Sequence, residues 1–139
     1  MRTIDWWITM LAPTGEIPAI NDSHRGLFPT KLLRDGAELF GKSDVYSVLR
    51  NLFGEKRRGN EPLPKFPSRH MPASGFSVMR TDWTPDALYL TVNYGPFAGF
   101  HSHFDLLDFE LYAYGKPLAV DAGIGLTYDD PLYNPWYRS

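Results

Sequence analysis

Two histidines one residue apart are the side chains of this chain best suited to chemistry. His101 and His103 flank Ser102, and they follow the glycine- and proline-rich segment 95–99. In an extended strand, side chains two residues apart point to the same side and lie about 6–7 Å apart. Two imidazoles so placed can share a metal ion, or divide into a metal ligand and a base. The pair alone is a weak signal, because two surface histidines are the commoner reason for it.

Behind the histidines, the sequence has the two-residue hydrophobic period of an antiparallel sheet. Leu88, Leu90 and Val92 alternate with more polar residues, and turn-forming residues separate this run from its neighbours. We expect strands at residues 76–81, 87–94, 104–114 and 116–121, joined in a meander that forms half of a sandwich.

The first part of the chain has helical patterns instead. Residues 4–11 are apolar on most sides, and one-sided apolar stripes follow over 30–40 and 44–53, which predicts a helix and then a helical hairpin. The cluster Asn21-Asp22-Ser23 lies in the long loop before the hairpin, where we expect these side chains to bond their own backbone. The prolines beyond residue 58 predict an extended linker. The expected organisation is a helical part at 1–58, a linker at 59–74 and a sheet domain at 75–139.

Composition excludes several functional classes. The formal net charge of −2 gives no basic field that would recruit a nucleic acid, so an anionic ligand must meet local positive groups. The absence of cysteine excludes thiolate and disulfide chemistry. No stretch approaches the roughly 18 apolar residues that a membrane span needs. The start of the chain does not have the pattern of a signal peptide, because Asp5 interrupts its apolar run.

Several motifs of the second half, taken together, resemble a known family. They are the His101-Ser102-His103 triplet, the run 105–118, the motif Val120-Asp121-Ala122-Gly123 and the closing segment 133–139. In this order they resemble the heparinase II/III-like polysaccharide lyases over residues 75–139, and segment 13–23 resembles a loop of the same family's helical domain. The resemblance implies an α+β fold, in which the C-terminal helices of an (α/α) toroid precede an incomplete antiparallel β-sandwich. It also implies a fragment of a periplasmic or secreted parent protein.

The resemblance also implies roles for individual residues. His101 corresponds to a catalytic histidine, and His103 and Asp121 correspond to two ligands of a structural zinc ion. The family's third zinc ligand would lie past Ser139, and its catalytic tyrosine would lie before the first residue. The chain alone is therefore expected to be inactive. Arg138 is a candidate for binding the substrate carboxylate, with surface or interdomain pairing as the alternative.

Strand geometry alone favours a different partner for the histidines. Asp105 lies two residues beyond His103, on the same face of an extended strand. A two-residue turn at 114–115 sets Asp121 opposite Asp108, about 16 Å along the ladder from His103. Asp121 can join His103 at one metal only if the chain bulges or leaves the strand near Asp105.

The chemistry expected from the resemblance is β-elimination in a polysaccharide that contains uronic acid. Heparin or heparan sulfate, chondroitin and alginate all remain open as substrates. One alternative is a non-catalytic carbohydrate-binding or structural sandwich module with a structural metal, and a second is a metal-dependent hydrolase. Uncovered strand edges and apolar faces also predict self-association as a homo-oligomer, or marginal stability, when the chain is made alone.

Overall fold

The fold is known from a computed structural model of the 139-residue chain. It describes residues 3–56, 59–65, 67–97, 99, 101–104, 107–124, 127–132 and 135. Within that part of the chain, no helix is long and apolar enough to cross a membrane.

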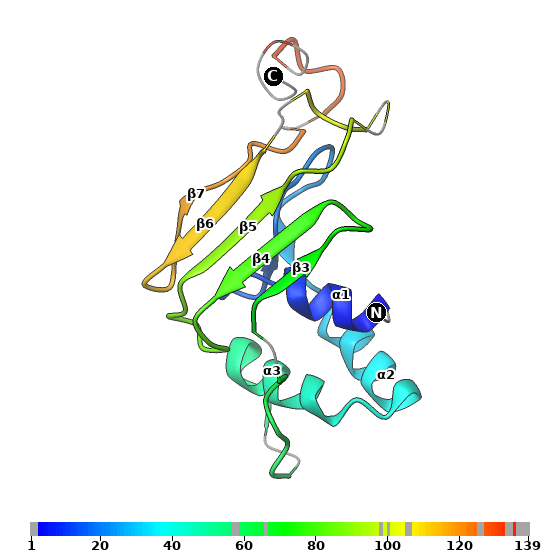
Figure 1. The fold of residues 1–139 in the computed structure, drawn as a ribbon, viewed down its shortest axis with the longest axis vertical. Helices are drawn as coiled ribbons and strands as arrows, with labels where there is room; N and C mark the ends of the chain where they lie inside the picture. The colour runs from blue at the N-terminus through cyan, green and yellow to red at the C-terminus, as the bar shows by residue number, and fades with distance from the viewer. Residues whose placement is uncertain are drawn as a thin grey trace.

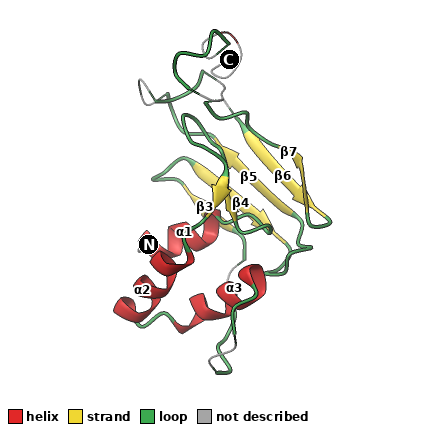
Figure 2. Ribbon diagram, turned by 180° about the vertical axis from the view of Figure 1, so that it is seen from behind, coloured by secondary structure: helices red, strands yellow, loops and turns green. Residues whose placement is uncertain are grey.

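Three helices pack together at one end of the molecule (Figures 1 and 2). Their apolar stripes meet in one core, in which Leu33 of the second helix and Val48 of the third are fully buried. Gly41 ends the second helix in the left-handed conformation (φ 62°), which glycine adopts without steric penalty. The helices are α1 (Thr3–Met10), α2 (Thr30–Phe40) and α3 (Ser43–Phe53), as the hydrophobic periods predict.

Five antiparallel strands form the sheet in simple chain order, which confirms the predicted meander and the α+β class. They are β3 (Arg69–Met71), β4 (Phe76–Arg80), β5 (Tyr89–Asn93), β6 (Phe109–Ala113) and β7 (Lys116–Ala119). A separate pair, β1 (Glu16–Ile17) and β2 (Gly26–Leu27), lies within the long loop between α1 and α2.

The two faces of the sheet have different surroundings. On the inner face, Val78, Tyr89 and Tyr112 pack against Met10 and Ala12 at the end of α1, so helices and sheet share a second core. On the outer face, apolar side chains line a shallow hollow: Met79 of β4, Leu88 just before β5, Leu90 of β5 and Leu111 of β6.

Two expected boundaries differ from the structure. Strand β3 lies inside the segment 59–74, which the prolines suggested to be linker, and it pairs with β4 through Met71 and Phe76. Strand β6 begins at Phe109 instead of residue 104, so the histidines precede it in a loop. A register shift at residues 111–112 then changes how β7 pairs with β6.

The long loop between α1 and α2 is fixed across the inner face of the sheet. The buried Glu110 carboxylate accepts the backbone N–H of Ala19 at 2.8 Å and the Tyr112 hydroxyl at 2.9 Å. Arg25 donates to the same hydroxyl at 2.9 Å. In Figure 1 this loop rises from α1 to the end of the sheet where the histidine loop lies. The sheet thereby brings residues near 20 to residues near 100.

Candidate functional site

The two histidines lie in the loop between β5 and β6. A hydrogen bond from the Ser102 N–H to the Gly99 carbonyl, at 2.9 Å, closes a turn just before His103. The strand geometry that would place both imidazoles on one face is therefore absent. The structure nevertheless directs both rings to one carboxylate, which comes from the other half of the chain.

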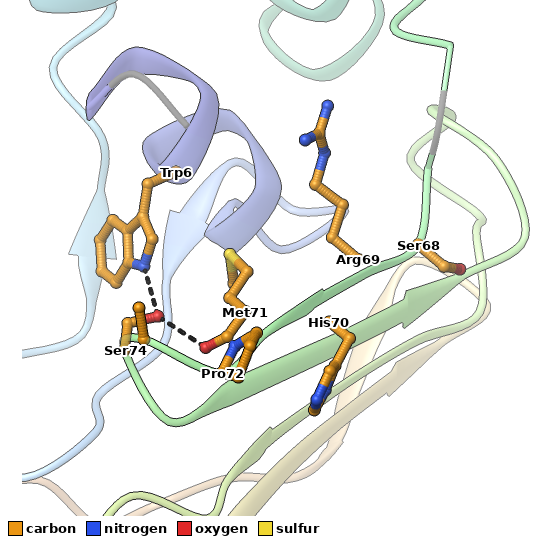
Figure 3. Close-up of a pocket in the computed structure, with 8 residues that line it drawn as sticks. Trp6, Ser68, Arg69, His70, Met71, Pro72 and Ser74 are labelled. Atoms are coloured by element: carbon orange, nitrogen blue, oxygen red, sulfur yellow. Dashed lines mark hydrogen bonds between the residues drawn. The ribbon is translucent and has the colours of Figure 1, made fainter.

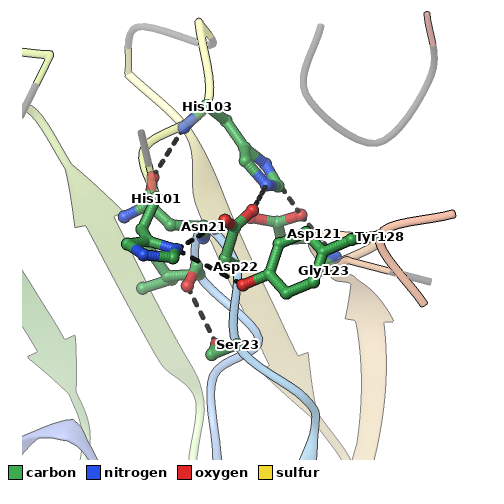
Figure 4. Close-up of polar contacts among 9 residues, drawn as sticks. Asn21, Asp22, Ser23, His101, His103, Asp121, Gly123 and Tyr128 are labelled. Carbon is green, nitrogen blue, oxygen red and sulfur yellow. Dashed lines mark hydrogen bonds and ion pairs between the residues drawn. The ribbon is translucent and has the colours of Figure 1, made fainter. Parts of the chain in front are cut away.

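That carboxylate is Asp22 (Figure 4). Its Oδ2 lies 3.0 Å from Nδ1 of His101, and its Oδ1 lies 3.3 Å from Nε2 of His103. The Asp22 side chain is only 4% exposed. A buried carboxylate is stable only where donors surround it, and each facing imidazole nitrogen can donate in one of its two tautomers. Asp22 therefore connects the histidine loop to the loop between α1 and α2.

Asn21 strengthens the same connection. Its backbone has a left-handed conformation (φ 57°), which asparagine tolerates better than most residues. Its side-chain oxygen accepts the His103 N–H at 3.0 Å, and its own N–H donates to Asp121 Oδ2 at 3.2 Å. The Asp22 N–H donates to the His101 carbonyl at 3.3 Å. Two consecutive residues thus hold both histidines and Asp121 together.

Asp121 lies beside His103, as the resemblance implies. Its Oδ1 is 4.0 Å from Nδ1 of His103 and accepts the Gly123 N–H at 2.8 Å. The expected separation of about 16 Å is wrong because it assumed a continuous ladder from His103 onward, whereas the strand begins only at Phe109. Asp105, the partner that strand geometry favoured, lies outside the described residues.

Exposure divides the site into an open part and a closed part. The His101 side chain is 80% exposed, whereas His103 is 1% and Asp121 5% exposed. An exposed imidazole can meet a solute, whereas the buried pair can meet only an enclosed ion or proton.

The phenol of Tyr128 also lies at the open part. Its oxygen is 3.3 Å from Nδ1 of His101, and the two rings meet edge to face. Partial desolvation raises the pKa of Tyr128, and the nearby Asp22 carboxylate raises it further by its charge and by a hydrogen bond. Tyr128 therefore remains protonated at neutral pH and acts as a donor.

The buried pair has the chemistry of half a metal site. If Nε2 of His103 donates to Asp22, its Nδ1 presents a lone pair to an oxygen of Asp121. Two acceptors that face each other at 4.0 Å away from water repel, unless a proton or a cation lies between them. Zinc bonds of about 2.0–2.2 Å to nitrogen and oxygen fit within that separation. Among the described residues, no three acidic or histidine side chains are grouped to hold a metal.

One hollow borders the site, and a second lies further along the same segment of the chain. One, of about 260 Å³, is lined by His103, Asn21 and Phe97 among others. The exposed rings of Phe97 and Phe104 stack beside it, with centroids 5.1 Å apart. A larger hollow of about 530 Å³ lies between α1 and β3, where the Trp6 indole donates to Ser74 (Figure 3). The smaller hollow is the one that contacts the site, and both are lined by residues 72–74.

Sequence reasoning found three residues of this site and missed three. His101, His103 and Asp121 come together as the resemblance implies, whereas Arg138 lies outside the described residues. The missed residues are Asn21, Asp22 and Tyr128. Asn21 and Asp22 were assigned to local turns, and the signal that pointed further was the likeness of segment 13–23 to a loop of the same family.

Comparison with known proteins identifies the family of the chain. The family model described as heparinase II/III-like, C-terminal, matches residues 63–139, which is more than half of the chain. The chain belongs to the heparinase II/III-like family. The match covers the sheet, the histidine loop and Asp121.

Individual proteins also resemble the chain in sequence or in fold. A heparin-sulfate lyase of Bacteroides stercoris is 41% identical over 93 residues, which cover 67% of this chain and 13% of that protein. A crystal structure of a heparan sulfate lyase mutant from Pedobacter heparinus has a TM-score of 0.81 at 24% identity. A heparinase III structure with methylated lysines has a TM-score of 0.79 at 26% identity. Each structure matches 97% of this chain, which spans 21% of the solved one.

Proposed function

We propose that this chain supplies part of the active site of a polysaccharide lyase that cleaves a uronic-acid polymer by β-elimination. One observation carries the proposal. In a chain of the heparinase II/III-like family, an 80% exposed imidazole is held by a buried carboxylate, next to a buried histidine–aspartate pair.

β-Elimination makes three demands on a site. The carboxylate of the sugar must be neutralised, a base must remove the proton at the carbon beside it, and an acid must protonate the leaving oxygen. His101 is suited to the base role, because its imidazole is 80% exposed and is held by Asp22. The Tyr128 hydroxyl lies beside it, with its O–H directed to Asp22, so its oxygen can accept a hydrogen bond from a sugar hydroxyl. Arg138 remains our candidate for the substrate carboxylate.

We further propose that His103 and Asp121 hold a structural zinc ion, with a third ligand from outside the described residues. Two observations support this proposal. Nδ1 of His103 faces Oδ1 of Asp121 at 4.0 Å, and other contacts orient each of these side chains. Both Asp121 oxygens accept backbone N–H groups, from Gly123 and Asn21. Such outer contacts are typical of metal sites. When bound, zinc would fix the segment after β7 to the histidine loop.

Heparan sulfate and heparin are the substrates to test first, because similar proteins are named as lyases of these polymers. The stacked Phe97 and Phe104 offer an exposed apolar surface of the kind on which sugar rings pack. Chondroitin and alginate remain as further uronic polymers for comparison.

The test is to incubate the full gene product with each polymer and follow the ultraviolet absorbance of the unsaturated sugar that elimination creates. We expect absorbance with heparan sulfate or heparin, and its loss in His101→Ala. His70→Ala is the matched control, because His70 is exposed on β3 and bonds Ser77 instead of the site. New reducing ends without absorbance would indicate a hydrolase. Binding without cleavage would indicate a carbohydrate-binding module.

A further inference from the structure

Asp22 contacts opposite nitrogens of the two histidine rings. It meets His101 through Nδ1 at 3.0 Å and His103 through Nε2 at 3.3 Å. A neutral imidazole carries one N–H, and the partner of each ring nitrogen decides which one is protonated. A single carboxylate can therefore impose different tautomers on two neighbouring histidines.

We propose that Asp22 is a positioning residue that keeps a proton on Nδ1 of His101 and on Nε2 of His103. Nε2 of His101 then presents its lone pair to solvent, from an imidazole whose orientation is fixed. The assignment of tautomers rests on geometry alone. Its use, which is to make Nε2 of His101 the proton acceptor, rests on the function proposed above.

The surroundings of Asp22 disfavour the other tautomer of His101. With the proton on Nε2, the lone pair of Nδ1 would face Asp22 Oδ2 at 3.0 Å. The carboxylate is 4% exposed, so water cannot relieve this repulsion. The Tyr128 hydroxyl, 3.3 Å from the same Nδ1, bonds Asp22 as a donor and completes the shell of donors around the carboxylate.

Hydrogen bonds to the backbone of the histidine loop hold Asp22 close to both imidazole rings. The Asp22 N–H donates to the His101 carbonyl, and the Asn21 side chain accepts the His103 N–H at 3.0 Å. Rotation of either imidazole away from Asp22 leaves these backbone contacts in place. The carboxylate therefore remains available to draw each ring back to one orientation.

Nitrogen-15 NMR of the labelled chain measures the tautomers directly. The spectra are recorded about two pH units above the ordinary histidine pKa, where exposed imidazoles are neutral. We expect Nδ1–H for His101, protonated Nε2 for His103, and for exposed His24 the Nε2–H form that free imidazoles favour. In Asp22→Asn, His101 should shift toward the form of His24. Asp35→Asn makes the same chemical change on α2 and should leave His101 unaltered.

Two results would overturn the proposal: predominant Nε2–H at His101 in the wild type, or an unchanged His101 tautomer in Asp22→Asn. The wild-type spectrum decides the question even if the variant fails to fold. In the full gene product, Asp22→Asn should lower kcat by about 10- to 100-fold with little change in KM. If the tautomers are as proposed but no unsaturated sugar forms, the proposed function fails and the positioning role stands.

Discussion

The guanidinium of Arg80 donates a hydrogen bond to the backbone carbonyl of Leu11, 69 residues earlier in the chain. Arg80 is 6% exposed, and it lies over the rings of Trp83 at 4.1 Å and Tyr89 at 4.9 Å. Burial lowers the pKa of Arg80 to about 10, so it remains charged at neutral pH. One buried charge thus joins the end of α1 to the inner face of the sheet.

We expect Arg80→Met to lower the free energy of unfolding by about 2–3 kcal/mol. The Leu11 carbonyl loses a charged donor, and the stacking on two aromatic rings is lost, while removal of a desolvated charge offsets part of the cost. Arg80→Lys should also destabilise, because an ammonium cannot replace a planar, stacked donor. Urea unfolding checks both, with half-buried Arg69→Met as the control. Equal stability of the wild type and Arg80→Met would disprove the structural role.

Gly123→Ala should destabilise the contact between the segment after β7 and the loop that carries Asp22. A Cβ at Gly123 would lie 2.4 Å from the Ser23 carbonyl oxygen, at a φ of 62°. We expect a loss of about 2 kcal/mol or more, since strain of about 1–2 kcal/mol from the left-handed conformation adds to a backbone clash. Gly41→Ala has the same φ of 62° but open space around the new Cβ, so it isolates the strain. Thermal unfolding of both variants measures the difference, and equal losses would exclude the clash.

The two histidines should respond differently to substitution in the full gene product. His101→Ala removes an 80% exposed ring, so elimination should fall to background while folding and zinc content persist. His103→Ala removes a 1% exposed ring that we propose as a zinc ligand, so zinc content and melting temperature should both fall. Metal analysis and calorimetry distinguish the two, with His24→Ala as the control. Full zinc occupancy in His103→Ala would count against the ligand assignment.

Glu110 should make stability depend on pH. Burial raises the pKa of Glu110, and hydrogen bonds from Tyr112 and Ala19 oppose that rise only in part. The folded state therefore binds more protons than the unfolded state between the ordinary and the raised pKa. Consequently, the contribution of Glu110 to stability is greatest below the ordinary glutamate pKa and falls as pH rises through the raised one.

The measurement is the difference in unfolding free energy between the wild type and Glu110→Gln, followed from acid to neutral pH. The wild type should lose stability relative to Glu110→Gln as pH rises through that window. Glu38→Gln, an exposed change on α2, should show no such trend. A difference that is constant with pH, or of opposite sign, would refute the assignment.

The 139-residue chain made alone should self-associate through the outer face of the sheet. Met79 and Leu88 there are 48% and 49% exposed, and they line the same apolar hollow. Replacing both with lysine should shift the chain toward monomer in sedimentation experiments. Leu39→Lys is the control. It alters an apolar side chain on α2 that is 75% exposed, and it should leave the association state unchanged. A monomeric wild type would exclude this interface.

Local patterns predicted the elements better than their boundaries. The helices and the order of the strands follow from hydrophobic periods, because each period determines which face is buried. The predicted start of β6 was wrong by five residues, since the apolar alternation of the sequence begins at Phe104 whereas the strand begins at Phe109. Strand β3 was missed because it is three residues long and lies among prolines.

The candidate site could be predicted from local sequence patterns only in part. His101 and His103 were found by residue type, and Asp121 by resemblance to a family. Asp22 was interpreted as a turn residue because short polar clusters usually bond their own backbone. Its role depends on a contact 79 residues away, and no sequence period records such a contact.

The contact between Asp22 and His101 also affects how members of this family can be recombined. The obvious place to join halves of two relatives is the proline-rich segment after α3. A junction there would take His101 from one parent and Asp22 from the other, together with the Asn21 contacts that align them. Chimaeras built on secondary-structure boundaries would then pair mismatched loops, even when both parents fold well. The sheet and residues 19–23 must therefore be taken from the same parent. The two segments are separated in the sequence, so no single crossover point keeps them together.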